Sequence, residues 1–195
     1  MNPLKLPSSL STRRTSLALA LVATSVLTTT LATPSAAAPA EPDSSAKAAD
    51  TGLERQIEGL LQHNEGAERV GKDRVRLAPG VEMTVVPSTH GAADGTGDCR
   101  TGYACVWQHR DATGYRLDFY YYGSYTLSDY TMPDGSSWQD KVSSYYNAQT
   151  DGAWIVGRNW DPVAGGLEWI FGGPGGRYEA LVSANDQADV IELYA

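Results

Sequence analysis

Two cysteines, Cys99 and Cys105, lie close together in the stretch DCRTGYACVWQ and are the only thiols of the chain. A close thiol pair can bind a metal, exchange electrons or form a disulfide. A structural zinc site needs four ligands, and the three histidines, His63, His90 and His109, are scattered. A redox pair more typically has the spacing Cys-x-x-Cys. In an oxidising compartment two cysteines normally form a disulfide, so the compartment decides between these uses.

The N-terminus indicates such a compartment. Basic residues precede the short apolar stretch LALALVATSVL, and the small residues of PSAAAPA follow it. We interpret residues 1–40 as a signal peptide, of the ordinary secretory kind because Ser16 stands where a twin-arginine signal prefers a large apolar residue. We therefore expect a secreted, extracellular protein in which Cys99 and Cys105 form a disulfide.

Oxygen-bearing side chains gather in the stretches QDKVSS and NDQADV, where Asp140 and Ser143 have the same spacing as Asp186 and Asp189. Calcium prefers several hard oxygen ligands, so these four residues are candidate Ca²⁺ ligands. The alternative is that they only turn the chain and hydrogen-bond the turn, as Asp, Asn and Ser commonly do.

The sequence gives little support to catalysis. It contains no Gly-x-Ser-x-Gly and no His-Glu-x-x-His, and its thiols are unreactive once they pair. Paired carboxylates for glycoside chemistry depend on a distance in space that the sequence does not give. We therefore expect a protein that is not an enzyme.

The net charge of −8 argues against a nucleic acid or an anionic membrane as partner. Residues 1–40 contain three basic and no acidic residues, so the exported chain is more acidic still. This charge either keeps the protein soluble or favours a cation or a basic partner.

Aromatic residues define the expected main domain. All eleven Tyr, five Trp and two Phe lie between Tyr103 and Tyr194. Short Tyr-, Trp- and Val-rich runs are broken there by Gly, Asp, Asn and Pro, a pattern typical of a β-sandwich or barrel. ACVWQHRDATGYRLDF is answered by AWIVGRNWDPVAGGLEWIF, which indicates two similar units. We expect a domain over residues 99–195 with Greek-key motifs at about 99–147 and 148–195.

Residues 41–50 are expected to form a linker, and 87–98 a second one. Between them, residues 51–86 predict a helix that begins at Thr51, with Glu54 in capping-box spacing, followed by a β-hairpin in RVRL-APG-VEMTVV. One helix and one hairpin are too small to be stable alone, so this segment either docks on the aromatic domain or is a propeptide. The expected apolar faces are Leu53, Ile57, Leu60 and Leu61 on the helix and Val81, Met83 and Val85 on the hairpin.

The stretch DFYYYGSY, residues 118–125, predicts a strand with aromatic side chains on both faces. Exposed tyrosines at 120–125 could stack on cell-wall glycan. Alternatively, they cover a small sandwich and seal its edge.

The segments CRTGYACVW, TGYRLDFY, YTLSDY, WQDKVSSYYN and NDQADVIELY resemble the βγ-crystallin fold. More closely, residues 99–195 resemble the secreted actinobacterial peptidase inhibitor family built on that fold, whose best-known members inhibit metalloproteinases. The helix-plus-hairpin segment resembles the region that precedes this domain in longer members. The resemblance implies an all-β, βγ-crystallin-like sandwich of two Greek-key motifs, preceded by a small helix-plus-hairpin segment. It also implies a secreted inhibitor of an extracellular (metallo)peptidase.

One departure from this family affects the expected inhibitory loop. Inhibitory members carry a second cysteine pair that braces the loop entering the peptidase, whereas NAQTDGAW has no cysteine here. An ordered loop matters because binding then freezes little further motion. The first candidate contacts are Asn147, Thr150, Asp151 and Trp154, and the loop closed by the two cysteines is the second candidate. The alternative function is a non-inhibitory, calcium-binding structural or cell-wall-binding βγ-crystallin module.

The resemblance also implies the metal-site pattern Asn/Asp-Asn/Asp-x-x-Ser/Thr-Ser in both motifs. The first stretch departs from it at Gln139, and the second has Asp189 for Ser/Thr and Val190 for the last Ser. Since ligand charge and rigidity set calcium affinity, we expect Ca²⁺ to bind weakly if these stretches hold it.

Overall fold

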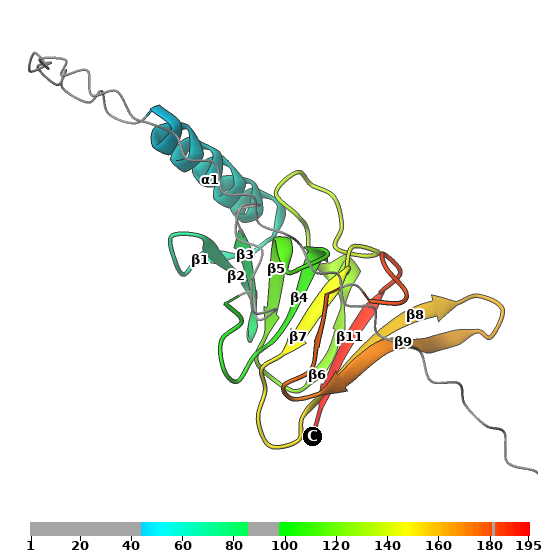
Figure 1. The fold of residues 1–195 in the computed structure, drawn as a ribbon. Helices are drawn as coiled ribbons and strands as arrows, with labels where there is room; N and C mark the ends of the chain where they lie inside the picture. The colour runs from blue at the N-terminus through cyan, green and yellow to red at the C-terminus, as the bar shows by residue number, and fades with distance from the viewer. Residues whose placement is uncertain (1–43, 86–97, 181) are drawn as a thin grey trace, which may run out of the picture. The chain divides into compact units, whose positions relative to one another are not determined.

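The computed structural model describes residues 44–85, 98–180 and 182–195 (Figure 1). All of them belong to one compact unit, which begins at Glu41. The expected signal peptide, residues 1–40, and nearly all of the expected linker 87–98 lie outside the described residues. Within the described residues, no helix has both the length and the apolarity needed to cross a membrane.

Helix α1 spans Ser44–His63 and so begins earlier than the expected Thr51. The predicted linker over 41–50 is therefore wrong from Ser44 onward, because the Ala and Lys residues of this stretch are good helix formers. Thr51 lies inside the helix, and Glu54 accepts two hydrogen bonds from the Arg69 guanidinium, at 2.7 and 2.8 Å. Glu54 therefore holds the chain that follows the helix instead of capping its start.

The strands form two antiparallel sheets. The seven-stranded sheet has the order β1-β2-β3-β5-β4-β7-β10, and the four-stranded sheet has the order β6-β11-β8-β9. The bounds in the first sheet are β1 Glu68–Arg69, β2 Arg74–Ala78, β3 Val81–Val85, β4 Ala104–His109, β5 Thr113–Phe119, β7 Ser144–Asn147 and β10 Tyr178–Glu179. Those in the second are β6 Gly123–Thr126, β8 Trp154–Asp161, β9 Gly166–Pro174 and β11 Val190–Tyr194, and a short 3₁₀ turn, Leu127–Asp129, follows β6.

Strands β4–β7 and β8–β11 are the two Greek-key motifs, and they exchange strands. The third strand of the first motif, β6, pairs with β11 in the opposite sheet, and the third strand of the second, β10, pairs with β7. Each sheet therefore contains strands of both motifs. This topology confirms the expected all-β sandwich of two Greek-key motifs.

The N-terminal hairpin extends the first sheet. Strand β3 pairs with β5 along its whole length, from Val81 opposite Phe119 to Val85 opposite Tyr115. A buried polar link joins the same two strands, because the Thr84 hydroxyl donates to the Asp118 carboxylate at 3.0 Å. The prediction that this segment docks on the aromatic domain is confirmed, since it is part of the same sheet.

The larger of two apolar clusters lies between the sheets and continues beneath α1. Each large side chain taken out of water there contributes about 1.5–3 kcal/mol of transfer free energy. The helix adds Ile57 and Leu60, both almost fully buried. The largest buried members from the strands and their connections are Trp138, Tyr145, Phe119, Phe171, Met83, Leu117, Leu127, Met132 and Ile155.

The expected continuous strand over residues 118–125 is wrong. Strand β5 ends at Phe119 and β6 begins at Gly123, so residues 120–122 are the connection between them. The physical reason is the strand exchange, since the chain must leave the first sheet here and enter the second. Gly123 has φ +155°, a backbone conformation that an L side chain rarely adopts.

Candidate functional site

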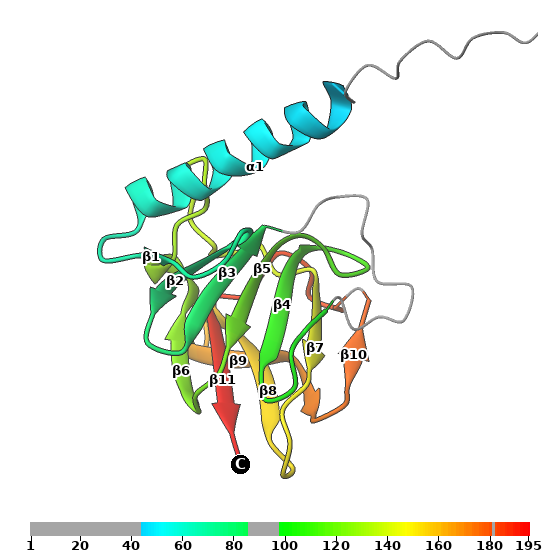
Figure 2. The ribbon, with the colours of Figure 1, turned by 90° about the vertical axis from the view of Figure 1, so that its left-hand side faces the viewer.

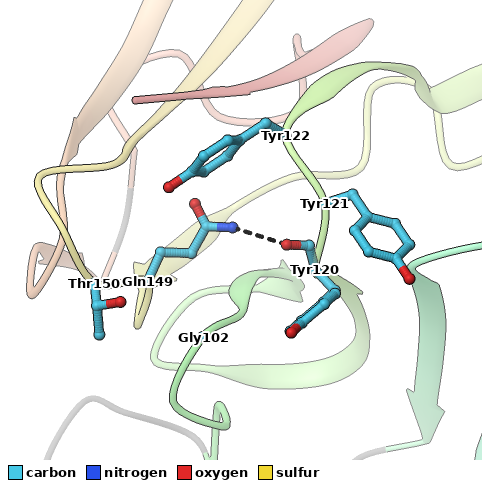
Figure 3. Close-up of a pocket in the computed structure, with 6 residues that line it drawn as sticks. All are labelled: Gly102, Tyr120, Tyr121, Tyr122, Gln149 and Thr150. Atoms are coloured by element: carbon cyan, nitrogen blue, oxygen red, sulfur yellow. Dashed lines mark hydrogen bonds between the residues drawn. The ribbon is translucent and has the colours of Figure 1, made fainter.

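Three connections meet at the end of the domain opposite α1 (Figure 2). They are residues 99–105, 120–122 and 148–153, and we call them together the three-loop surface. The Gly102 amide donates to the Ala148 carbonyl at 2.8 Å, and the Ala148 amide donates to the Tyr103 carbonyl at 2.9 Å. The Gln149 side-chain amide donates to the Tyr120 carbonyl at 3.3 Å (Figure 3). The structure therefore brings both candidate inhibitory loops beside the tyrosines.

The predicted disulfide between Cys99 and Cys105 is formed. Its loop is further fixed by Arg100, whose guanidinium lies 2.6 Å from the Glu82 carboxylate. The same guanidinium stacks over the Tyr103 ring at 3.9 Å from the ring centroid, a favourable cation–π distance. Because Glu82 lies on β3, the N-terminal hairpin also helps to position this loop.

Asn147 is completely buried, so its side chain is not accessible to a partner. Its side-chain amide donates to the carbonyl of Ala153 at 2.9 Å and to that of Gly173 at 3.2 Å. Its side-chain oxygen accepts a hydrogen bond from the Gln149 amide at 3.2 Å. One side chain thus joins both ends of loop 148–153 and ties it to β9.

The exposed tip of the loop is a tight turn. The Ala153 amide donates to the Thr150 carbonyl at 3.2 Å. Asp151 and Gly152 between them have φ +62° and +78°, the left-handed values of a type I′ turn, which Asp-Gly adopts readily. Thr150 and Asp151 are both exposed, and the Thr150 hydroxyl donates to the Asp151 carboxylate at 3.1 Å.

Trp154, the last predicted contact, lies outside this tip. It begins β8, and its neighbour Ile155 points into the core, so the Trp154 side chain points to the outer face of the four-stranded sheet. Thr150 and Asp151 are thus the two predicted residues that are placed to touch a partner at the tip.

Tyrosines 120–122 line a hollow beside this loop. Tyr120, Tyr121 and Tyr122 are 48, 55 and 53% exposed, and the hollow of about 270 Å³ that they line with Gly102, Gln149 and Thr150 is drawn in Figure 3. The Tyr120 ring lies 5.1 Å from that of Tyr103 and 5.0 Å from that of Tyr121, measured between centroids. The rings of Tyr103, Tyr120 and Tyr121 therefore form one continuous aromatic surface.

The turn between β2 and β3 also contributes to this surface, which was not predicted from the sequence. A second hollow of about 440 Å³ shares Tyr120 and Tyr121 and is lined by Pro79 and Gly80 of this turn. A Cβ at Gly80, which has φ +76°, would lie 2.3 Å from the Tyr121 ring, so only glycine leaves room for the ring here. The APG signal was visible in the sequence, but its neighbour in space was not.

The four predicted calcium ligands lie in two neighbouring turns. The Asp140 amide donates to the Ala188 carbonyl at 3.0 Å, and the Asp186 amide donates to the Val142 carbonyl at 3.1 Å, a reciprocal pair between the motifs. Asp140 and Asp186 both have left-handed φ, 57° and 54°. The Ser143 hydroxyl donates to the Gln108 carbonyl at 2.7 Å and lies 3.2 Å from the Asp186 carboxylate.

Most oxygens of these turns already accept hydrogen bonds from the protein. The Asp189 carboxylate accepts from the Gln139 side chain at 2.6 Å and from the Trp160 amide at 2.7 Å. Partial burial raises the pKa of the Asp140 carboxyl, and the Asp189 and Asp186 carboxylates raise it further. Over the described ranges, no group of three or more His, Cys, Asp or Glu side chains is arranged to hold a metal ion. The residues therefore serve the turns first, and a cation would have to compete with these hydrogen bonds.

The segment that contains the disulfide, the tyrosines and loop 148–153 can be compared with known families. Residues 92–156 match peptidase inhibitor family I36. This match confirms the resemblance to a peptidase inhibitor family. The I36 match begins before the disulfide loop and ends just inside β8, so it contains all three connections of the three-loop surface.

Two solved structures are similar to this chain. One is a double mutant of a βγ-crystallin domain from Clostridium beijerinckii, which is 19% identical, covers 48% of this chain and 98% of its own, and has a TM-score of 0.36. The other is Hahellin, a βγ-crystallin, which is 15% identical, covers 48% of this chain and 92% of its own, and has a TM-score of 0.34. No curated protein matches the chain.

Proposed function

We propose that this protein is a secreted inhibitor that blocks an extracellular peptidase with the three-loop surface. The carrying observation is that Asn147 fixes loop 148–153 at both of its ends without a second disulfide. A loop that is ordered before binding loses little conformational entropy in the complex. The I36 match over the same residues supports a peptidase as the partner.

The conformation of the loop tip favours an inhibitor that covers the peptidase cleft over one that enters the cleft as a substrate does. Peptidases hold substrates extended across their clefts, whereas Asp151 and Gly152 have left-handed φ values in a closed turn. The loop would therefore cover the cleft without placing a peptide bond for attack. A metallopeptidase is the proposed target class, because the exposed Asp151 carboxylate is a group that a catalytic zinc ion accepts as ligand.

A panel of purified peptidases tests this function. The chain from Glu41 to Ala195 is titrated against a thermolysin-type metallopeptidase, a subtilisin-type and a trypsin-type serine peptidase, and residual activity is measured. We expect inhibition of the metallopeptidase at micromolar concentration or below, with the inhibitor recovered intact. No inhibition of any member of the panel at that concentration would remove the proposal.

A calcium-stabilised extracellular module is the second candidate. The observation that favours it is the reciprocal pair of backbone hydrogen bonds that holds the Asp140 turn beside the Asp186 turn. Burial first, and then the carboxylates of Asp189 and Asp186, raise the pKa of Asp140, and a cation would relieve the repulsion among these carboxylates. The competing hydrogen bonds to Asp189 point to weak binding, with Kd on the order of 10⁻³ M. Melting curves with and without about 10 mM CaCl₂ test it, since a ligand above its Kd raises Tm. An unchanged Tm would exclude it.

A further inference from the structure

A second aromatic surface lies away from the three-loop surface, on the outer face of the four-stranded sheet. Ile155 on β8 and Leu193 on β11 point into the core, so the alternate residues Trp154, Trp160 and Tyr194 point outward. They are 40, 54 and 44% exposed.

Strand β9 adds to the same face. Trp169 pairs directly with Arg158, and Leu167 pairs directly with Trp160, so both β9 residues lie on the outward side of β8. Trp169 is 59% and Leu167 40% exposed. The end of the β8–β9 hairpin extends beyond the neighbouring strands, where another molecule can approach it (Figure 1). Exposed apolar patches of this kind commonly mark binding sites.

The charges on this face cancel. The outward residues of its strands include one cation, Arg158, and one anion, Glu192, which form an ion pair at 2.5 Å with 29 and 25% of their side chains exposed. The outward side chains of these strands therefore add no net charge, although the acidic residues Asp161 and Glu168 lie on the same hairpin. An anionic partner gains no long-range attraction here, because the chain as a whole is acidic.

The exposed aromatic rings and the ion pair together favour one of two kinds of partner. A protein, including a second copy of this chain, would have to bury the Arg158–Glu192 pair, and burying an ion pair costs desolvation free energy. A neutral polysaccharide offsets this cost, because its hydroxyl groups can donate to the carboxylate and accept from the guanidinium in place of water. The apolar faces of its sugar rings can meanwhile stack on the exposed tryptophans.

We propose that the outer face of the four-stranded sheet binds a neutral polysaccharide through Trp160 and Trp169, with Trp154 and the Arg158–Glu192 pair completing the site. Trp154 and Trp160 are about 20 Å apart along β8 at about 3.3 Å per residue, and Trp169 lies between these two levels. A row of rings of this length suits a chain of sugars better than a single one. The site would hold the protein on an extracellular polymer independently of the three-loop surface.

Co-sedimentation tests this proposal with the chain from Glu41 to Ala195. The probes are three insoluble neutral polysaccharides, chitin, cellulose and β-1,3-glucan, with bound protein measured over a range of concentrations. The test variant is Trp160→Ala/Trp169→Ala, and the matched control is Tyr120→Ala/Tyr122→Ala, which removes two exposed rings from the other surface. Circular dichroism and melting curves check that each variant folds. If the double tryptophan variant does not fold, the single variant Trp160→Ala replaces it.

We expect binding to at least one of the three polymers, weakened about tenfold or more by the tryptophan variant and unchanged in the tyrosine variant. Peptidase inhibition should survive the tryptophan change, which separates this proposal from the proposed function. Absence of binding to all three polymers, or equal binding by the tryptophan variant, would overturn it. So would a dimer detected by sedimentation that the tryptophan variant loses, because the face would then be an interface between copies.

Discussion

The side-chain amide of Asn147 donates a hydrogen bond to the carbonyl of Ala153 at 2.9 Å, across the whole of loop 148–153. Since Asn147 is fully buried, this bond and the ones to Gly173 and Gln149 form out of water, where an unpaired partner would be costly. One residue therefore sets the shape of the exposed turn, on which the proposed inhibition depends.

Replacing this side chain should loosen the loop. We expect Asn147→Ala to lower the free energy of unfolding by about 1–3 kcal/mol, because buried carbonyls at Ala153 and Gly173 lose their donor. Denaturant unfolding gives the magnitude, and limited proteolysis should show new cleavage within 148–153. The control Asn185→Ala, at an exposed position, should change stability by about 0.5 kcal/mol or less. Equal stability of the two variants would show that Asn147 does not brace the loop.

Adding one methyl group at Gly80 should displace Tyr121. The new Cβ would lie 2.3 Å from the ring, at φ +76°. We expect Gly80→Ala to lower Tm and to alter tyrosine packing in the near-ultraviolet circular dichroism spectrum. Gly66 is a matched control with the same φ of +76° and no atom within 4 Å of its added Cβ, so Gly66→Ala reports the backbone cost alone, about 1–2 kcal/mol. If the two variants behave alike, Tyr121 is not seated on Gly80.

The contributions of Asp140 and Asp134 to stability should change with pH in opposite directions. Burial and the carboxylates of Asp189 and Asp186 raise the pKa of Asp140, so its contribution to stability falls as pH rises through the interval above 3.8. Asp140→Asn should therefore raise Tm at pH 7 by about 1–2 °C and leave it unchanged near pH 3.

The opposite holds for Asp134. Hydrogen bonds from the Ser136 hydroxyl and amide lower the pKa of Asp134, so its contribution is present above 3.8 and is lost as pH falls through the folded-state pKa. Asp134→Asn should lower Tm at pH 7 and have little effect at pH 2. Melting curves of both variants across this range check the two signs, and shifts of the same sign would contradict the assignment.

Helix α1 and the N-terminal hairpin should be needed for folding. Strand β3 covers the edge of β5, and Val81, Met83 and Val85 lie in the common core. A chain of residues 98–195 would expose this edge and the apolar face beneath it, so we expect it to aggregate or to melt without cooperativity. The chain of residues 44–195 is the control. A shortened chain with a cooperative transition within a few degrees of the control would show that the segment is dispensable, as a propeptide is.

Much of this fold could be predicted, because turn residues and alternating apolar residues mark strands locally. The hairpin through Val81 and Met83 and the two four-stranded motifs have such patterns, and the structure has both. The prediction of one strand over residues 118–125 was wrong, because the exchange of β6 between the sheets depends on contacts with residues far away in the sequence. The start of α1 at Ser44 was missed because a polar, alanine-rich stretch is typical of linkers as well as of helices.

The candidate site was predictable only in its parts. The disulfide followed from the compartment, and the 148–153 loop from the family resemblance. No local pattern shows that a buried Asn147 takes the place of a covalent brace, since an asparagine before a turn is ordinary. The meeting of the tyrosines with Gly80 is likewise a result of tertiary packing.

The inhibition constant of a loop-tip variant, compared with that of a remote one, decides whether the three-loop surface blocks the peptidase. Thr150→Arg places a large side chain on the exposed tip, and Glu58→Arg places the same side chain on the exposed side of α1, at the other end of the domain. Against the metallopeptidase that the wild-type chain inhibits, we expect the inhibition constant to rise about tenfold or more for Thr150→Arg and to stay unchanged for Glu58→Arg. Equal inhibition by both variants would contradict the claim that the three-loop surface blocks the peptidase.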